Sequence, residues 1–145
     1  MKICQIEPGE TYEPTVLALG NFDGVHLGHQ KLLKCGLEKA QSSNASLAVL
    51  LFDPHPLKVL YPERKIILLT GREERLMLFE DIGVHKVFLQ QFTPQLANTS
   101  PLEFVQKILL KVGAVHVVVG FNYSFGYQGK GSPNDLAEFG KECGF

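Results

Sequence analysis

The sequence predicts an α/β protein built on a doubly wound parallel sheet. Short apolar runs rich in valine and leucine alternate along the chain with segments whose apolar residues recur at helical spacing. The runs are continuously apolar instead of alternating with polar residues, which is typical of parallel strands covered by helices on both faces. A chain with this alternating order of strands and helices is expected to form one parallel sheet with right-handed crossovers.

The first strand is expected over residues 16–19, an apolar run that Gly20 ends. A helix is expected over residues 29–42. Its predicted buried face consists of Leu32, Leu33, Leu37 and Ala40. The second strand is expected over residues 47–52, where every residue is apolar, and a proline-containing loop should follow it.

A helix cap and a glycine predict the next helix. Thr70 and Glu73 have the spacing of a capping box, which predicts a helix that runs to Ile82 and ends at Gly83. A short strand over residues 86–89 is expected to follow. These elements repeat the strand–helix alternation of the first half of the chain.

The last part of the chain repeats the same signals. Ser100 and Glu103 form a second predicted capping box, with a proline at the first helical position. The helix is expected to run to about residue 112, and the fourth strand should cover residues 115–119. Residues 132–135 (Ser-Pro-Asn-Asp) are expected to open a last helix.

The composition excludes several kinds of protein and partner. The 145 residues suffice for one domain, expected to span residues 1–145, and the net charge of −1 gives no attraction to nucleic acid or to an anionic membrane. No apolar run has transmembrane length, and the N-terminus does not resemble a signal peptide, so a cytoplasmic protein is expected. The three cysteines form no C-x-x-C pair, which argues against a disulfide framework or a zinc knuckle.

The most informative segment is G-N-F-D-G-V-H-L-G-H, residues 20–29, which joins the first strand to the first helix. The free N–H groups and the dipole of a helix N-terminus favour phosphate binding. Gly24 and Gly28 permit close approach of the backbone because they lack a Cβ atom. His26 and His29 can supply hydrogen-bond donors or positive charge. The segment therefore predicts a triphosphate site that stabilises charge on phosphorus.

Two further polar or glycine-containing segments follow predicted strands. Residues 53–56 come after the second strand, and residues 120–126 come after the fourth. Parallel sheets bind ligands at the carboxyl ends of their strands, at a switch in strand order. We therefore expect these two segments and residues 20–29 to converge on one edge of the sheet.

The three segments resemble motifs of a known family. H-x-G-H within G-N-F-D-G-V-H-L-G-H is similar to the signature of the nucleotidylyltransferase superfamily, which has a Rossmann-like fold. F-D-P-H-P at residues 52–56 and V-G-F-N-Y-S-F-G at residues 119–126 are similar, more narrowly, to the adenylyltransferase module of bacterial FAD synthetase, the bifunctional riboflavin kinase and FMN adenylyltransferase. The resemblance implies that AMP passes from ATP to FMN, giving FAD and pyrophosphate, while Mg²⁺ neutralises the leaving group.

The resemblance also implies roles for individual residues. His26 and His29 are the expected catalytic pair at the α-phosphorus. The expected ATP site consists of Gly20, Asn21, Phe22, Asp23, Gly24, His26, Gly28 and His29. The expected FMN site consists of Asp53, His55, Asn122 and Phe125. Within it, Asn122 should touch phosphate or flavin, and Phe125 should stack near the isoalloxazine ring. No protein ligand to a metal is expected.

Several of these residues also have plainer interpretations. Asn21 and Asp23 are residues of the kind that form an Asx-turn or a helix cap, although Asp23 could also orient a histidine or the hydrated metal. Asp53 could simply cap a turn, and Phe125 could be ordinary core. His26, His29 and His55 would be a possible zinc set, but His26 and His29 flank a glycine in a loop instead of sharing a helix face.

The extent of the match bears on activity. The family's module continues with an I-S-S-T-like segment that holds the nucleotide, and no such segment occurs in residues 1–145. A C-terminally truncated module is therefore expected, without the last strand of the sheet and without the riboflavin kinase domain of the full-length parent. The alternatives are a catalytically incompetent nucleotide- or flavin-binding fragment, or an adenylyl- or cytidylyltransferase for another small phosphorylated metabolite.

Overall fold

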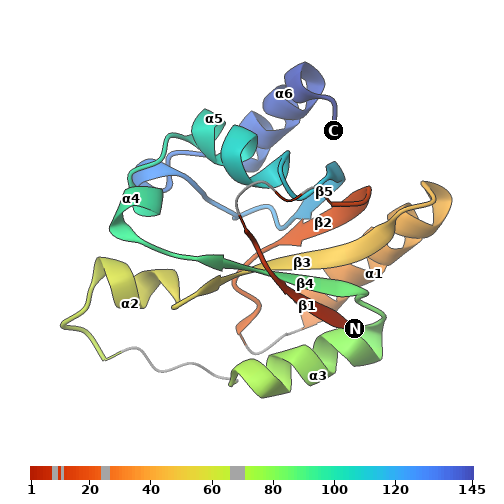
Figure 1. Cartoon of the computed structure of the whole chain (residues 1–145), viewed down its shortest axis with the longest axis horizontal. Coiled ribbons are helices and arrows are strands. Elements are labelled where there is room, and N and C mark those ends of the chain that lie inside the picture. The colour runs from red at the N-terminus through yellow and green to blue at the C-terminus, as the bar shows by residue number, and fades with distance from the viewer. Residues whose placement is uncertain (8–9, 11, 24–26, 66–70) are drawn as a thin grey trace.

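The computed structural model contains a parallel sheet between two layers of helices (Figure 1). It describes residues 1–145 with the exception of 8–9, 11, 24–26 and 66–70. The described strands are β1 (Lys2–Gln5), β2 (Thr15–Leu19), β3 (Ser46–Asp53), β4 (Lys86–Gln91) and β5 (Ala114–Val119). They lie in the order β1-β4-β3-β2-β5, and every neighbouring pair is parallel. The predicted doubly wound α/β fold is confirmed.

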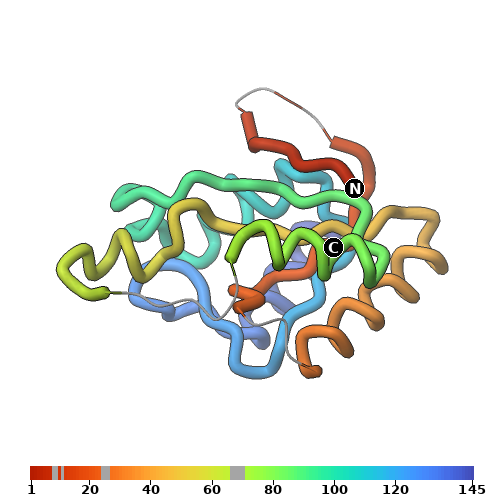
Figure 2. Tube along the Cα trace, turned by 90° about the horizontal axis from the view of Figure 1, so that it is seen from below, coloured from red at the N-terminus to blue at the C-terminus, as the bar shows by residue number. Residues whose placement is uncertain are grey.

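The described helices connect these strands. They are α1 (Leu27–Ser42), α2 (Pro56–Leu60), α3 (Arg72–Ile82), α4 (Pro94–Ala97), α5 (Pro101–Phe104), the π-helix η2 (Val105–Leu109), the 3₁₀ turn η3 (Tyr127–Gly129) and α6 (Pro133–Cys143). Helices α1 and α3 cover one face of the sheet, and α5, η2 and α6 cover the other (Figure 1). Figure 2 shows the same arrangement from below, with α2 projecting beyond the carboxyl ends of the strands.

Strand β2 contributes side chains to both cores. Its Val16 and Ala18 pack into the layer of α1 and α3, while Leu17 and Leu19 pack into the layer of α5, η2 and α6. All five residues of β2 are buried. Burial of both faces explains the continuous apolar run in the sequence, since each buried leucine or valine contributes about 1.5–3 kcal/mol relative to exposure.

The strand order fixes where a ligand site should form. From β2 the sheet grows through β3 to β4 in one direction, and β5 then adds to the opposite side of β2. The order therefore reverses between β2 and β5. The crevice at the carboxyl ends of two such strands is the usual ligand site of open parallel sheets.

Most predicted elements are present, with small shifts at their ends. Helix α1 begins two residues before the predicted start, and Gly83 ends α3 in the left-handed conformation (φ 112°) as expected. Thr70 lies outside the described residues, and Gly71 occupies the N-cap position of α3 without a side-chain cap. Ser132 and Asp135 form the full capping box of α6.

Four differences from the expectation concern short or unusual elements. Strand β1 was not expected, nor was helix α4. The loop predicted after β3 contains helix α2, so the prediction of an unstructured loop was wrong. The helix expected from Pro101 to about residue 112 changes after one turn into the π-helix η2, in which Leu110 N–H donates to Val105 O. Ser100 caps this helix, but the Glu103 carboxylate pairs with Lys107.

Candidate active site

A cavity of about 1180 Å³ opens at the carboxyl ends of the strands. It lies at the reversal point between β2 and β5 and is bounded on the other side by the segment after β3. Its lining brings together residues of all three motif segments. They include Gly20, Asn21, Gly28 and His29; Phe52, His55 and Pro56; and residues 120–126. The predicted convergence on one edge of the sheet is therefore observed in the structure.

The turn after β2 is held by a buried phenylalanine. Phe22 adopts a left-handed backbone conformation (φ 53°) and has no exposed surface. Its ring lies 5.1 Å from the ring of His29 on α1 and 5.4 Å from that of Phe79 on α3. A bulky residue is uncommon at positive φ, so this conformation depends on packing around the ring. Phe22 thus supports the turn from beneath instead of lining the cavity.

His29 is the catalytic candidate that the structure describes. It lies in the first turn of α1, lines the cavity, and packs against Phe22 from above. Gly28 precedes it in the cavity wall. His26 and Gly24 were predicted for the same site and lie outside the described residues. Asn21 lines the cavity, whereas half-buried Asp23 is outside the lining.

His55 caps helix α2, which lines the cavity on the side opposite the turn after β2. Its Nδ1 accepts a hydrogen bond from Leu57 N–H at 3.1 Å, which caps helix α2. The pKa of His55 is lowered, mainly by burial and next by the Arg75 guanidinium; Asp23 opposes the shift and Lys58 adds to it. The neutral ring therefore accepts at Nδ1 and carries its proton on Nε2. It thus offers one hydrogen-bond donor for a ligand.

Asp53 is the last residue of β3 and does not line the cavity. Its carboxylate lies 3.5 Å from the Arg72 guanidinium of α3, and its carbonyl accepts from Phe92 N–H at 3.2 Å. Asp53 therefore links β3 to α3 and to the end of β4. Its interpretation as a simple turn cap is not what the hydrogen bonds show.

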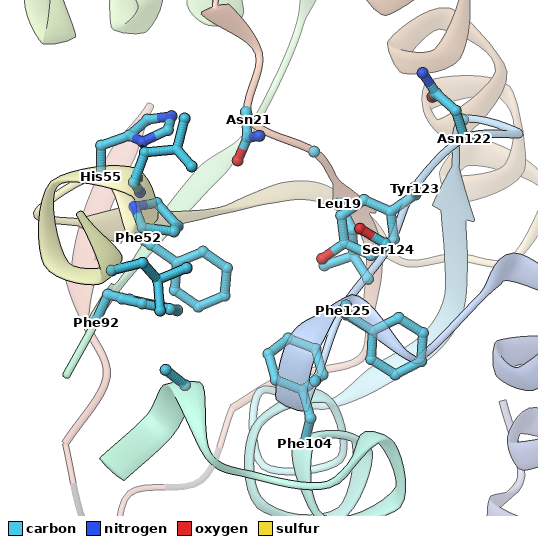
Figure 3. Close-up of a pocket in the computed structure, with 18 of the residues that line it drawn as sticks. Leu19, Asn21, Phe52, His55, Phe92, Phe104, Asn122, Tyr123, Ser124 and Phe125 are labelled. Atoms are coloured by element: carbon cyan, nitrogen blue, oxygen red, sulfur yellow. Dashed lines mark hydrogen bonds between the residues drawn. The ribbon is translucent and has the colours of Figure 1, made fainter. Parts of the chain in front are cut away.

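Aromatic rings form the apolar wall (Figure 3). Phe52 contacts Phe92 at 5.4 Å and Phe104 at 6.1 Å, measured between ring centroids. Phe104 contacts Phe125 at 5.5 Å, and Phe125 is stacked with Tyr123 at 6.0 Å. Phe125 therefore belongs to the buried core and also lines the cavity. Burial raises the pKa of the Tyr123 hydroxyl, which keeps that group protonated.

The segment after β5 presents its residues in different directions. Tyr123, Ser124 and Phe125 lie along the apolar side of the cavity, while the Asn122 side chain points away from that aromatic wall (Figure 3). Phe121 beside it is 94% exposed. The backbone of Phe125 pairs with that of Gly131 in both directions, at 3.2 and 2.8 Å, which fixes the position of the aromatic ring.

Sequence reasoning missed several residues of the wall. Phe92 directly follows β4, so its place after a predicted strand was an available signal. Phe104 lies within an apolar helix face and reads as ordinary core. Leu57, Leu60 and Tyr61 reach the cavity only because the segment after β3 folds into α2 and projects from the sheet.

Comparison with known proteins identifies the family. Residues 9–145 match the family model described as FAD synthetase. The chain belongs to the FAD synthetase family. The membership confirms the resemblance inferred from the motifs. Among the described residues, no helix combines the length and hydropathy needed to cross a membrane.

Curated relatives of the family match a large part of this chain. It is 42% identical over 125 residues to the bifunctional riboflavin kinase/FMN adenylyltransferase of Listeria monocytogenes, covering 86% of this chain and 40% of the relative. It is 35% identical over 132 residues to the protein of that name from Bacillus subtilis, covering 88% and 42%. An FAD synthetase of L. monocytogenes is 36% identical over 136 residues, covering 90% and 53%. The chain thus spans about half the length of these relatives, or less.

A crystal structure supports the same fold. The structure is described as a macrolide-efflux protein from Streptococcus pneumoniae, and it aligns with a TM-score of 0.85 at 27% identity. The alignment covers 96% of this chain and 47% of that one. The parallel sheet with its flanking helices is therefore shared almost in full.

Proposed function

We propose that this chain is an FMN adenylyltransferase module, which transfers AMP from ATP to FMN and yields FAD and pyrophosphate. One observation carries the proposal: a single cavity joins a glycine–histidine turn to a wall of aromatic rings. The turn suits a triphosphate, and the rings suit a flat ring system. Pockets for one small molecule commonly measure about 300–1,000 Å³, and this cavity of about 1180 Å³ lies above that range.

ATP would occupy the side formed by β2 and α1. Gly20, Asn21, Gly28 and His29 line this side, where α1 begins and the positive end of its dipole favours an anion. His29 would donate a hydrogen bond to a phosphate oxygen, with its ring supported by Phe22. His26 belongs to the proposal as the second histidine of the catalytic pair. The main chain of residues 22–24 would complete the expected ATP site.

FMN would occupy the side formed by β3, α2 and the segment after β5. The isoalloxazine ring would lie against the wall to which Phe125 and Tyr123 belong. His55 offers its Nε2–H to a ligand acceptor. Asn122, on the rim, and Asp53, at the end of β3, are the remaining proposed contacts.

The proposed chemistry is one displacement at phosphorus. An oxygen of the FMN phosphate forms a bond to the α-phosphorus of ATP, and the bond to the bridging oxygen breaks in line with it. Pyrophosphate leaves with that electron pair. The protein contributes positioning and charge stabilisation, and no covalent nucleophile is required.

Mg²⁺ is proposed to enter as part of the ATP substrate. No group of three or more His, Cys, Asp or Glu side chains in the described part of the chain is arranged to hold a metal ion. When bound, Mg²⁺ neutralises charge on the departing pyrophosphate.

The proposal extends to the full protein. Relatives named for both activities support a riboflavin kinase domain as the partner of this module, a domain that would supply its FMN. We propose that the protein acts in the cytoplasm, because the proposed reaction consumes ATP.

Incubation of the full protein with FMN, ATP and Mg²⁺, followed by chromatography, tests the proposal. FAD and pyrophosphate should appear in equal amounts. If a different phosphorylated acceptor is adenylylated and no FAD forms, that compound and not FMN is the acceptor. Binding of ATP and FMN without any turnover would identify a binding module instead of an enzyme.

A further inference from the structure

We propose that Arg75 on α3 is a positioning residue, which holds residues 20–23 after β2 (the proposed phosphate turn) from behind the cavity. The inference rests on the proposed function, because it assigns a role in organising that same site. Arg75 does not line the cavity. Its guanidinium Nη1 donates a hydrogen bond of 3.1 Å to the main-chain oxygen of Asn21, a cavity residue 54 positions earlier.

Helix α3 contacts two successive residues of the turn, Asn21 and Phe22. Arg75 and Phe79 are four positions apart, so they share one face of the helix. Arg75 bonds the carbonyl of Asn21, and the Phe79 ring packs against the ring of Phe22. Phe22 in turn packs against His29. The position of the catalytic candidate therefore depends on a chain of contacts that begins on α3, outside the cavity.

The bond between Arg75 and Asn21 meets the turn where regular structure ends. Asn21 lies beyond the last residue of β2, and Phe22 follows with its left-handed backbone. A hydrogen bond from a charged guanidinium is stronger than one between neutral groups. It therefore restrains the carbonyl orientation of a turn that must present N–H groups and His29 to phosphate.

Arg75 also acts on the opposite wall. Its positive charge disfavours protonation of His55, together with burial and Lys58, against the opposing charge of Asp23. Neutral His55 keeps the Nδ1 lone pair that accepts Leu57 N–H. A protonated ring would donate at both nitrogens and lose this cap. Burial of His55, and after it the charge of Arg75, therefore favour the cap of α2, whose Leu57 and Leu60 line the cavity.

The test compares R75Q and R75K with the control R72Q. Arg72 lies one turn earlier on α3, and its contact is an exposed pair with Asp53 instead of the turn. ATP affinity is measured by calorimetry, the KM of ATP by FAD formation, and the pKa of His55 by NMR titration of ¹³C-labelled histidine in the full protein. Thermal unfolding is recorded for each variant.

R75Q should raise the Kd and KM of ATP on the order of tenfold to a hundredfold, as expected for loss of a hydrogen bond from a charged group. It should also raise the pKa of His55, because a repelling positive charge is removed. R75K keeps the charge but loses the planar fork, so it should leave the pKa of His55 low and weaken ATP binding less than R75Q does. R72Q should change the Kd and KM of ATP by no more than about twofold, and it should leave the pKa of His55 as in the wild-type chain.

Two results would overturn the inference: unchanged ATP affinity and His55 titration in R75Q, or equal effects in R72Q. If R75Q does not fold, R75K decides, since wild-type ATP affinity in R75K would contradict the role of the fork. Binding and titration do not require turnover. Absence of FAD together with the expected R75Q shifts would therefore remove the proposed function and leave the positioning role in place.

Discussion

The phosphate turn and the aromatic wall face each other across one cavity, but they are built in opposite ways. The turn is a short stretch of chain that directly follows β2, and α3 contacts its described residues Asn21 and Phe22. The wall is assembled from rings on separate segments, among them Phe52 at the end of β3, Phe104 on α5 and Phe125 after β5. The residues of one side are therefore continuous in the sequence, whereas those of the other side come from separate segments.

This difference separates the expected effects of substitution. A change in the turn should act on ATP and on the chemical step, because the turn leads into the proposed triphosphate side of the cavity, which His29 lines. A change in the wall should act on FMN, because the wall offers apolar contact area. The following variants test that separation, beginning with the largest expected effect.

Replacement of His29 by alanine should lower kcat by about 10²–10³-fold, which is typical for loss of a donor that stabilises charge in the transition state. The KM of FMN should change little, because His29 lies on the ATP side of the cavity. Steady-state kinetics of FAD formation measure both quantities. His85→Ala is the matched control, since His85 is exposed and lines no part of this cavity. A kcat of H29A within about threefold of wild type would exclude His29 from the chemical step.

Replacement of Gly131 by alanine tests the wall from behind. A Cβ atom at Gly131 would lie 2.6 Å from atoms of the Phe125 ring, so the ring must shift. Such overpacking typically costs about 1–3 kcal/mol of stability. We expect a comparable loss in the free energy of unfolding and a raised KM of FMN, with the KM of ATP close to wild type.

Gly113→Ala provides the control for G131A. Gly113 has φ 77° and lies against the carbonyls of Tyr12 and Glu13, remote from the cavity lining. G113A should destabilise the fold without a specific effect on FMN. If both variants raise the KM of FMN equally, the wall responds to global stability and not to the position of Phe125.

The same difference explains how far the sequence could predict the molecule. The turn was predictable because its glycines and His29 lie within one short stretch between a strand and a helix. The wall was predicted only at Phe125, because Phe92 and Phe104 reach it through the tertiary fold. The Asp53–Arg72 pair likewise joins residues 19 positions apart.

Short elements were missed for a related physical reason. Strand β1 pairs only with β4 and contains two apolar residues, Ile3 and Cys4, so it lacks a continuous apolar run. The π-helix η2 has the same apolar spacing as an α-helix, and only its hydrogen-bond register differs. Periodicity predicts which face is buried, but it does not distinguish these registers.

The cap of α2 should make stability dependent on pH. Because the pKa of His55 in the folded chain lies below its ordinary value of 6.5, the unfolded chain binds the proton more readily. Stability is therefore complete above that value and decreases as the pH falls from about 6.5 through the folded pKa. The loss should be of the order of a helix cap, about 0.5–2 kcal/mol at most.

His55→Asn isolates this contribution. An asparagine oxygen can accept Leu57 N–H as an N-cap, but it does not titrate. Denaturant unfolding at pH 5 and pH 7.5 should show a smaller difference in H55N than in the wild-type chain. An identical pH dependence in both proteins would mean that other groups carry the acid sensitivity.

The smallest effect is expected at the pair of Arg72 and Asp53, which joins α3 to the end of β3 at 3.5 Å. Their side chains are 48% and 58% exposed, so water and salt screen the interaction. Exposed pairs contribute about 0.2–1 kcal/mol, and a double-mutant cycle of R72Q and D53N should give a coupling energy within that range that falls further in 1 M salt. A coupling well above it would mean that this pair ties β3 to α3 strongly. A small coupling would mean that the exposed pair contributes little, in contrast to the bond that we propose between Arg75 and the turn at Asn21.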